Sequence, residues 1–198
     1  MLITSMPVII AADMTENSPT SAPLTDPEIN QTAELLARIP AGFLPFPVFR
    51  QVARLAVFSI VEVVPMRIRD GQVEVLLLKR GEEKQDWPEL WPGILHTPGT
   101  VIRPTDELGS YKEAFRRILQ DELHAVELVS EPGYVYNLLH HNKRGTESAQ
   151  VFIVEVVGEP KVGAFYPADH LPNNIMLSQL DFIPTAVAAF KRAKGLIE

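Results

Sequence analysis

Two adjacent acids, Asp121 and Glu122, end a segment whose residue types suit divalent-metal chemistry. Mg²⁺ and Mn²⁺ are hard cations that prefer carboxylate oxygens as ligands. Arg117 lies four residues before Asp121, where a helix would place both side chains on one face. Asp106 follows a Pro-Gly turn farther upstream and offers a third carboxylate from a loop. The pattern predicts a metal site at Asp121, Glu122 and a loop acid, Asp106 or its neighbour Glu107.

A helical segment would limit what this site can bind. Adjacent helical residues point about 100° apart, so Asp121 and Glu122 would not face one ion directly. The residue one turn before Glu122 is Ile118, which cannot bind a metal. Glu113, Arg117 and Asp121 also have the spacing of a salt-bridge row on a helix surface, which would add little to stability. At this point the metal site and the surface row both stay open.

The surrounding pattern predicts the elements that would position these residues. Asp70-Gly71 is a strong turn signal between two Val-rich runs, which predicts a hairpin. Pro184 near the start and Gly195 at the end bound a C-terminal helix. The expected helices cover residues 25–39, 48–55, 111–122 and 183–194, and the expected strands 58–69, 73–80, 132–142 and 149–158. Residues 1–24 are rich in Ser, Thr and Pro, which predicts a mobile arm.

Residues 99–124 resemble a degenerate Nudix box, the signature of hydrolases that act on nucleoside diphosphates linked to another moiety. The residues in family register are Trp91, Pro98, Gly99, Ala114, Arg117, Leu119, Asp121 and Glu122. The later "FYPADHL" segment is similar to one that follows the last strand in many family members. The resemblance covers roughly residues 56–195.

Several positions depart from the family pattern. Thr100 stands in place of the second turn glycine, Ile118 in place of a helix acid, and His124 in place of the closing glycine. Asp106 replaces a Glu, and ten residues separate it from Arg117, three more than in the family. Because a β-branched Thr resists positive φ, the loop is expected to differ from the family's loop.

The resemblance implies an α/β fold, a Nudix-like α/β/α sandwich with a mixed β-sheet, plus an N-terminal helical extension. We expect a mobile arm over residues 1–24, the helical extension over 25–55 and the Nudix-like domain over 56–198. A homodimer is expected by analogy with the family.

The resemblance also implies a divergent Nudix-type hydrolase. It would act on a nucleoside-diphosphate-like substrate with Mg²⁺ or Mn²⁺, with weak or altered activity. Asp121 and Glu122 would hold the metal with help from Asp106, and Arg117 would orient the acids. The alternative is a catalytically inactive Nudix-like protein that binds a ligand or regulates, which Ile118 favours.

Two residues outside the box are candidates for substrate binding. Arg80 ends a predicted strand beside the expected cleft and could contact phosphates, or it could mark an exposed strand end. Trp91 could stack on a base or sugar, or pack its loop onto the core. His140 and His141 are adjacent on a predicted strand and would point to opposite faces, which favours a polar strand end over a shared metal.

The composition excludes several classes of function. The chain has no Cys, which rules out disulfides, thiolate zinc sites and cysteine nucleophiles. Its net charge of −7 argues against non-specific nucleic-acid binding. The first residues lack a basic stretch, and we find no apolar run long enough for a membrane span. We therefore expect a cytoplasmic protein that binds a small molecule.

Overall fold

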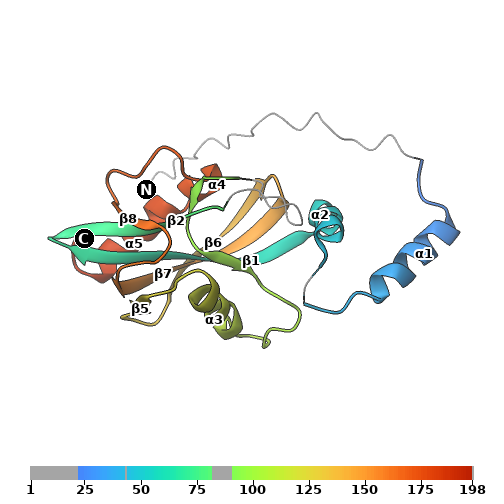
Figure 1. Ribbon diagram of the computed structural model, residues 1–198, viewed down its shortest axis with the longest axis horizontal. Coiled ribbons are helices and arrows are strands. Elements are labelled where there is room, and N and C mark those ends of the chain that lie inside the picture. Colours follow the sequence, from blue (N-terminus) through green and yellow to red (C-terminus); the bar gives the residue numbers. More distant parts are fainter. Residues whose placement is uncertain (1–21, 43, 82–90, 198) are drawn as a thin grey trace, which may run out of the picture. The chain divides into compact units, whose positions relative to one another are not determined.

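The computed structural model describes residues 22–42, 44–81 and 91–197 (Figure 1). The chain divides into two compact units, residues 1–39 and 40–198. The first unit contains α1 (Asp26–Ala37), whose position agrees with the predicted helix. The backbone N–H and the hydroxyl of Thr25 both donate to the Glu28 carboxylate, which fixes the start of α1. Most of the expected N-terminal arm, residues 1–21, lies outside the described residues.

The second unit is built around a mixed β-sheet. Its two longest strands, β1 (Val57–Arg69) and β7 (Gly145–Gly158), pair in parallel over ten residues of each strand. The strands that pair antiparallel with β1, β2 or β7 are β2 (Gln72–Lys79), β3 (Leu95–His96), β4 (Gly99–Val101), β5 (Val126–Leu128), β6 (Gly133–Asn142) and β8 (Ala164–Pro167). The expected mixed sheet is confirmed.

Two hairpins organise this sheet. Asp70 and Gly71 connect β1 to β2 with φ values of 50° and 77°, the positive values that a two-residue turn requires. The predicted first hairpin is therefore confirmed. The connection between β6 and β7 is shorter than predicted, because Asn142 already pairs with Gly145. Residues 145–148 were expected in a connector, but they alternate between buried and half-buried positions and begin β7.

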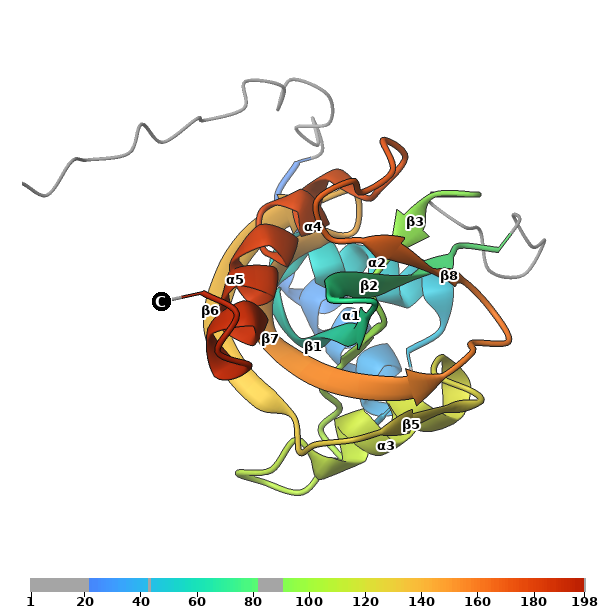
Figure 2. The same cartoon turned by 90° about the vertical axis from the view of Figure 1, so that its left-hand side faces the viewer.

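Helices cover both faces of the sheet (Figure 2). α3 (Lys112–Asp121) packs Ala114 and Ile118 against one face, where β1 contributes Val61 and Val63. α5 (Ile183–Ala193) packs on the opposite face, next to the short α4 (Leu177–Leu180). Side chains of β1 point alternately to the two faces of the sheet, and Ile60 and Val64 belong to the core cluster on the α5 side. The expected α/β/α layers are thus confirmed.

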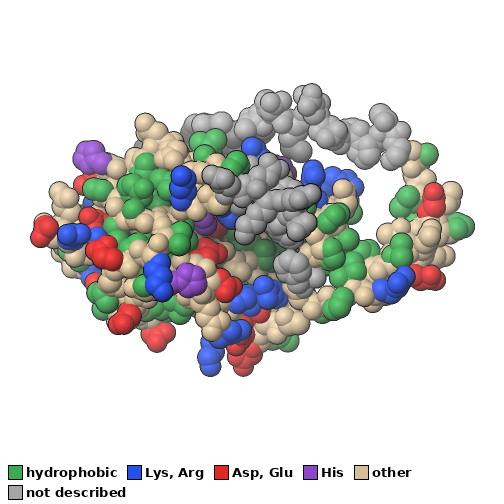
Figure 3. All heavy atoms as spheres, in the orientation of Figure 1, with side chains coloured by type: hydrophobic (Ala, Val, Ile, Leu, Met, Phe, Trp, Pro, Cys, Tyr) green, Lys and Arg blue, Asp and Glu red, His purple; other side chains and the backbone are tan. Residues whose placement is uncertain are grey.

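The remaining helix of the second unit, α2 (Phe46–Leu55), leads into β1 and buries Ala53. Ala53 lies close to Gly145, where an added Cβ would stand 2.1 Å from the Ala53 carbonyl oxygen. Acidic and basic side chains are interspersed on the face shown in Figure 3. No helix in the described part of the chain has the length and hydropathy needed to cross a membrane.

Candidate functional site

The C-terminal end of α3 opens onto a pocket. The helix ends at Asp121, and Glu122 caps it with φ −123° and ψ −35°, outside the helical region. The chain then turns at Ala125, which takes the left-handed conformation with φ 67°. A glycine normally favours this conformation, and the family's closing glycine falls one residue earlier, at His124. Because Glu122 lies beyond the helix, its side chain need not point 100° away from that of Asp121, as it would inside a helix. Both side chains line one pocket.

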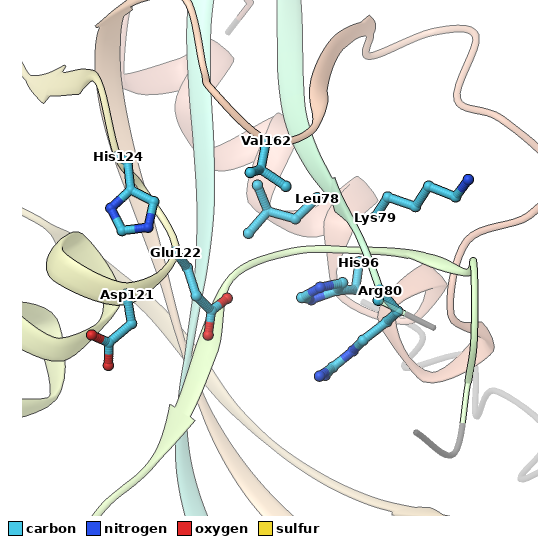
Figure 4. A pocket seen from close by; sticks show the side chains of 9 residues that line it. Leu78, Lys79, Arg80, His96, Asp121, Glu122, His124 and Val162 are labelled. Atoms are coloured by element: carbon cyan, nitrogen blue, oxygen red, sulfur yellow. The ribbon is translucent and has the colours of Figure 1, made fainter. Parts of the chain in front are cut away.

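The pocket has a volume of about 270 Å³ and carries opposite charges on its two sides (Figure 4). The residues that line it are Leu78, Lys79, Arg80, Gly81, His96, Asp121, Glu122, His124 and Val162. Glu122 extends toward Arg80 and His96, which come from the end of β2 and from β3, whereas Asp121 turns the other way. The acidic wall, formed by Asp121 and Glu122, therefore lies opposite the basic wall, formed by Lys79 and Arg80, and Glu122 is the acid that points across the pocket.

Glu122 is the most perturbed acid of the pocket. Burial raises its pKa to about 7, and the nearby positive charges of Arg80 and Arg144 oppose this rise. The backbone N–H of Gly99 also donates to the Glu122 carboxylate, at 3.4 Å. A carboxyl group with a pKa near neutrality can take up or release a proton under ordinary conditions, which is typical of functional sites.

His96 is a neutral hydrogen-bonding group in this pocket. Burial lowers its pKa to about 3, and the charge of Arg80 acts in the same direction. Its Nδ1 lies 2.8 Å from the backbone carbonyl oxygen of Thr97. Because a carbonyl oxygen only accepts, Nδ1 carries the ring proton and Nε2 is left as an acceptor.

Behind Gly99 lies a buried acid that sequence reasoning missed, Glu62 of β1. Its carboxylate accepts from the Thr97 hydroxyl at 3.0 Å and lies 3.5 Å from Nε2 of Gln179 in α4. Complete burial raises its pKa to about 8. A Cβ on Gly99 would stand 2.8 Å from this carboxylate, so a larger residue there would have to displace the Glu62 side chain. The signal in the sequence was a single Glu inside the apolar run "SIVEVVPM".

Asp106 and Arg117 have a different placement from the one expected. Arg117 Nη1 and Nη2 donate to the two Asp106 carboxylate oxygens at 2.5 and 2.8 Å, and Nη2 also donates to the Val101 carbonyl at 3.0 Å. Both side chains are nearly buried, and Arg117 holds the pKa of Asp106 below its usual range. The pair clamps the loop between β4 and α3, and neither residue lines the pocket.

The surface of α3 carries neither a carboxylate at position 118 nor the salt-bridge row of Glu113, Arg117 and Asp121. Ile118 is 1% exposed and packs in the core, so the position of the missing family acid faces the sheet. Glu113 forms its ion pair with Arg116 at 2.8 Å, while Arg117 binds Asp106. The expected surface row is therefore wrong, because Arg117 is buried. Thr100 lies in β4, where an extended backbone suits a β-branched residue.

The two candidate substrate residues are placed differently. Arg80 lines the pocket, whereas Trp91 does not. The Arg144 guanidinium lies over the Trp91 ring, with its central carbon 5.4 Å from the ring centroid. His140 and His141 have separate neighbours, as expected for adjacent strand residues. The His140 side chain is buried with its Nε2 3.5 Å from the Glu147 carboxylate, and His141 Nδ1 lies 3.2 Å from the Thr146 hydroxyl.

The carboxylates of Asp121 and Glu122 suit Mg²⁺ only when a bound substrate supplies further oxygen ligands. Among the described residues, no group of three or more His, Asp or Glu side chains is placed to hold a metal ion. The pocket offers the carboxylates of Asp121 and Glu122. Mg²⁺ is commonly bound by one or two carboxylates together with substrate phosphates and water. The residues present fit that mode of binding.

The fold is found in proteins of known structure, although no protein-family model and no curated protein matches the chain. A mutT/nudix family protein from Listeria innocua is 20% identical, with 71% of this chain and 98% of that chain covered and a TM-score of 0.53. The NUDIX domain of Shewanella oneidensis NrtR, complexed with ADP ribose, is 18% identical, with 80% and 97% covered and a TM-score of 0.50.

The chain has the Nudix fold. At these identities the likeness establishes the fold alone. Within the Nudix fold of this chain, residues 99–124, which resemble the Nudix box, form β4, the clamped loop and α3. This segment ends at the acidic wall of the pocket.

Proposed function

We propose that the pocket binds a nucleoside-diphosphate-like ligand and hydrolyses its diphosphate with a divalent metal, at a weak or altered rate. The observation that carries this proposal is the pairing of an acidic wall with a basic wall in one cavity. A metal-bound diphosphate needs both, because its cation is bound by carboxylates and its phosphate oxygens by cationic donors. The ADP ribose bound to the NrtR NUDIX domain supports this class of ligand.

Asp121 and Glu122 would hold the metal, which would neutralise phosphate charge and supply activated water. Arg80 and Lys79 would bind the phosphate oxygens from the opposite wall. Glu122 must lose its proton before its carboxylate binds a cation. Since burial raises the pKa of Glu122 to about 7, metal affinity should rise with pH through neutrality.

Ile118 favours a second candidate function, ligand binding without catalysis. Its side chain is part of the core, so α3 cannot present a third carboxylate from that position. Asp106 cannot replace it without leaving Arg117. A pocket with two carboxylates would then bind a metal-bound diphosphate and release it unchanged.

Titration of Mn²⁺ by calorimetry, with and without ADP ribose, tests the proposal. We expect weak binding of Mn²⁺ alone and at least tenfold tighter binding with the nucleotide, because phosphate oxygens complete the coordination shell. Asp121→Asn and Glu122→Gln should each remove this coupling. Glu113→Gln is the matched control, since Glu113 lies on the same helix but pairs with Arg116 at the surface.

Product analysis then separates the two candidate functions. Release of nucleoside monophosphate that disappears in Glu122→Gln supports hydrolysis. Coupled binding of Mn²⁺ and ADP ribose without turnover supports the binding protein. Absence of saturable Mn²⁺ binding under both conditions would contradict both. The homodimer and the cytoplasmic location remain predictions, and light scattering of the full chain would test the first.

A further inference from the structure

His96 lines the pocket from β3, which pairs with β2 through Leu78, and its ring is held in one orientation. Nδ1 lies 2.8 Å from the Thr97 carbonyl oxygen. Thr97 is itself fixed, because its backbone N–H donates to the Gln179 side chain at 2.7 Å and its hydroxyl donates to Glu62 at 3.0 Å. The imidazole is therefore oriented before a ligand binds, which lowers the entropic cost of a contact with it.

The other ring nitrogen of His96, Nε2, is an acceptor that is open to the pocket. Because Nδ1 carries the ring proton, Nε2 keeps a lone pair. Within residues 22–42, 44–81 and 91–197, no group donates a hydrogen bond to Nε2, and Nε2 is not one of the polar atoms sealed from solvent without a partner. Figure 4 shows the ring pointing toward Glu122 across the cavity. Nε2 is therefore placed to accept from a ligand in the pocket.

A neutral acceptor beside cationic side chains binds only certain parts of a ligand. The oxygens of an ionised diphosphate accept hydrogen bonds and donate none, so Nε2 cannot bind them. Burial and the charge of Arg80 lower the pKa of His96 to about 3, so the ring does not become a cation that would attract phosphate. Nε2 therefore requires an O–H or N–H group of the ligand.

The size of the cavity limits where this group lies in the ligand. The volume of about 270 Å³ is below the ~300–1,000 Å³ of sites that enclose a whole drug-sized ligand, so the pocket holds the diphosphate and the group next to it. Lys79 and Arg80 supply the cationic donors for the phosphates. In a nucleoside diphosphate linked to a sugar, the hydrogen-bond donors nearest to the phosphates are sugar hydroxyls.

We propose that His96 Nε2 accepts a hydrogen bond from a sugar hydroxyl of the ligand and makes the pocket selective for diphosphates that carry a hydroxylated sugar. This role rests on the proposed function, because it assumes that Lys79 and Arg80 bind a diphosphate. A site built to accept from a hydroxyl rejects a ligand that lacks it, since the buried acceptor would be left without a partner.

Binding of inorganic pyrophosphate, ADP and ADP ribose, measured by calorimetry with Mn²⁺ present, tests this role. His96→Asn keeps a polar group near the position of Nδ1 but loses Nε2. We expect it to lower the affinity for ADP ribose about tenfold and to leave the affinity for pyrophosphate unchanged. His141→Asn is the matched control, because the exposed His141 lies beside Thr146 and does not line the pocket, and it should bind all three ligands as the wild type does.

ADP shows which sugar supplies the hydroxyl. If His96→Asn also loses affinity for ADP, the hydroxyl belongs to the ribose of the nucleoside. If it loses affinity for ADP ribose alone, the hydroxyl belongs to the second ribose. Either result supports the role of His96.

The remaining outcomes separate this role from the proposed function. If His96→Asn binds ADP and ADP ribose as tightly as the wild type, the role of His96 is overturned and the proposed function stands. An equal loss for pyrophosphate also overturns it, because His96 would then act on the phosphates or on metal-bound water. If the wild type binds none of the three ligands, the proposed function itself fails. Should His96→Asn not fold, His96→Leu, which suits a buried position, decides the question by the same comparison.

Discussion

Replacing Ile118 by Glu would restore the family's acid and is the sharpest test of how α3 is seated. In this structure the new side chain would enter the core between α3 and the sheet, where Ile118 is 1% exposed. Burial of an Ile side chain stabilises a fold by ~1.5–3 kcal/mol, and the variant loses this contribution at every pH.

Ionisation adds a second cost that depends on pH. A carboxyl group at position 118 would be as buried as that of Glu62, whose pKa rises from 4.5 to about 8. A similar rise corresponds to about 5 kcal/mol, at ~1.4 kcal/mol for each pH unit. The folded pKa would lie above the unfolded pKa. This second cost is therefore absent below pH 4.5 and grows as the pH rises toward 8.

Urea unfolding at pH 5 and pH 8 measures both costs. We expect Ile118→Glu to lose roughly 2–3 kcal/mol at pH 5 and a further ~4 kcal/mol at most at pH 8, since three pH units at ~1.4 kcal/mol each separate the two conditions. Ile118→Leu, a change that conserves volume, should cost under ~1.5 kcal/mol at both values. A small loss without pH dependence, together with tighter Mn²⁺ binding, would show that position 118 faces the pocket and would refute the reasoning.

Three further variants test the parts around the pocket. Arg117→Ala leaves the buried Asp106 without its cation and should cost about 3–5 kcal/mol in urea unfolding, against under ~1 kcal/mol for Arg116→Ala; equal losses would show that the clamp is not a buried pair. Glu62→Gln removes a group that ionises, and the folded pKa of Glu62 is raised to about 8 by burial. The wild type therefore loses stability as pH rises from 4.5 to 8, and the variant should become more stable relative to it over this range. A stability difference that does not change with pH would contradict this. Gly99→Ala would place its Cβ 2.8 Å from the Glu62 carboxylate, so we expect a loss of ~1–3 kcal/mol and weaker calorimetric binding of Mn²⁺ with ADP ribose; unchanged binding would separate Gly99 from the pocket.

Local signals in the sequence were sufficient for the longer helices and strands, and the sequence identified three residues of the pocket, Arg80, Asp121 and Glu122. The turn at Asp70-Gly71 and the apolar stripe of α3 depend on neighbours a few residues away, so composition and spacing identify them. Asp121 and Glu122 were identified because residues 99–124 resemble the Nudix box. The spacing could not show that the helix stops at Asp121 and turns Glu122 into the pocket.

Long-range contacts account for what the sequence did not show. Glu62 of β1 lies beside Gln179 of α4, although the two residues are 117 positions apart in the chain. The pairing of Arg117 with Asp106 depends on the path of a loop whose length departs from the family's. The strand start at Gly145 follows from pairing with β6 and β1, which no local pattern encodes.

The parallel pairing of β1 with β7 has a kinetic consequence. It joins residues about 90 positions apart, whereas the β1–β2 hairpin joins near neighbours. Loop-closure entropy makes distant pairing slow, so the hairpin should form early and the β1–β7 ladder late in folding. Arg80 follows the early hairpin, whereas Glu122 precedes β5, which pairs with the late strand β7. The two sides of the pocket would therefore come together only near the end of folding, so a ligand of the pocket would bind only the completed sheet.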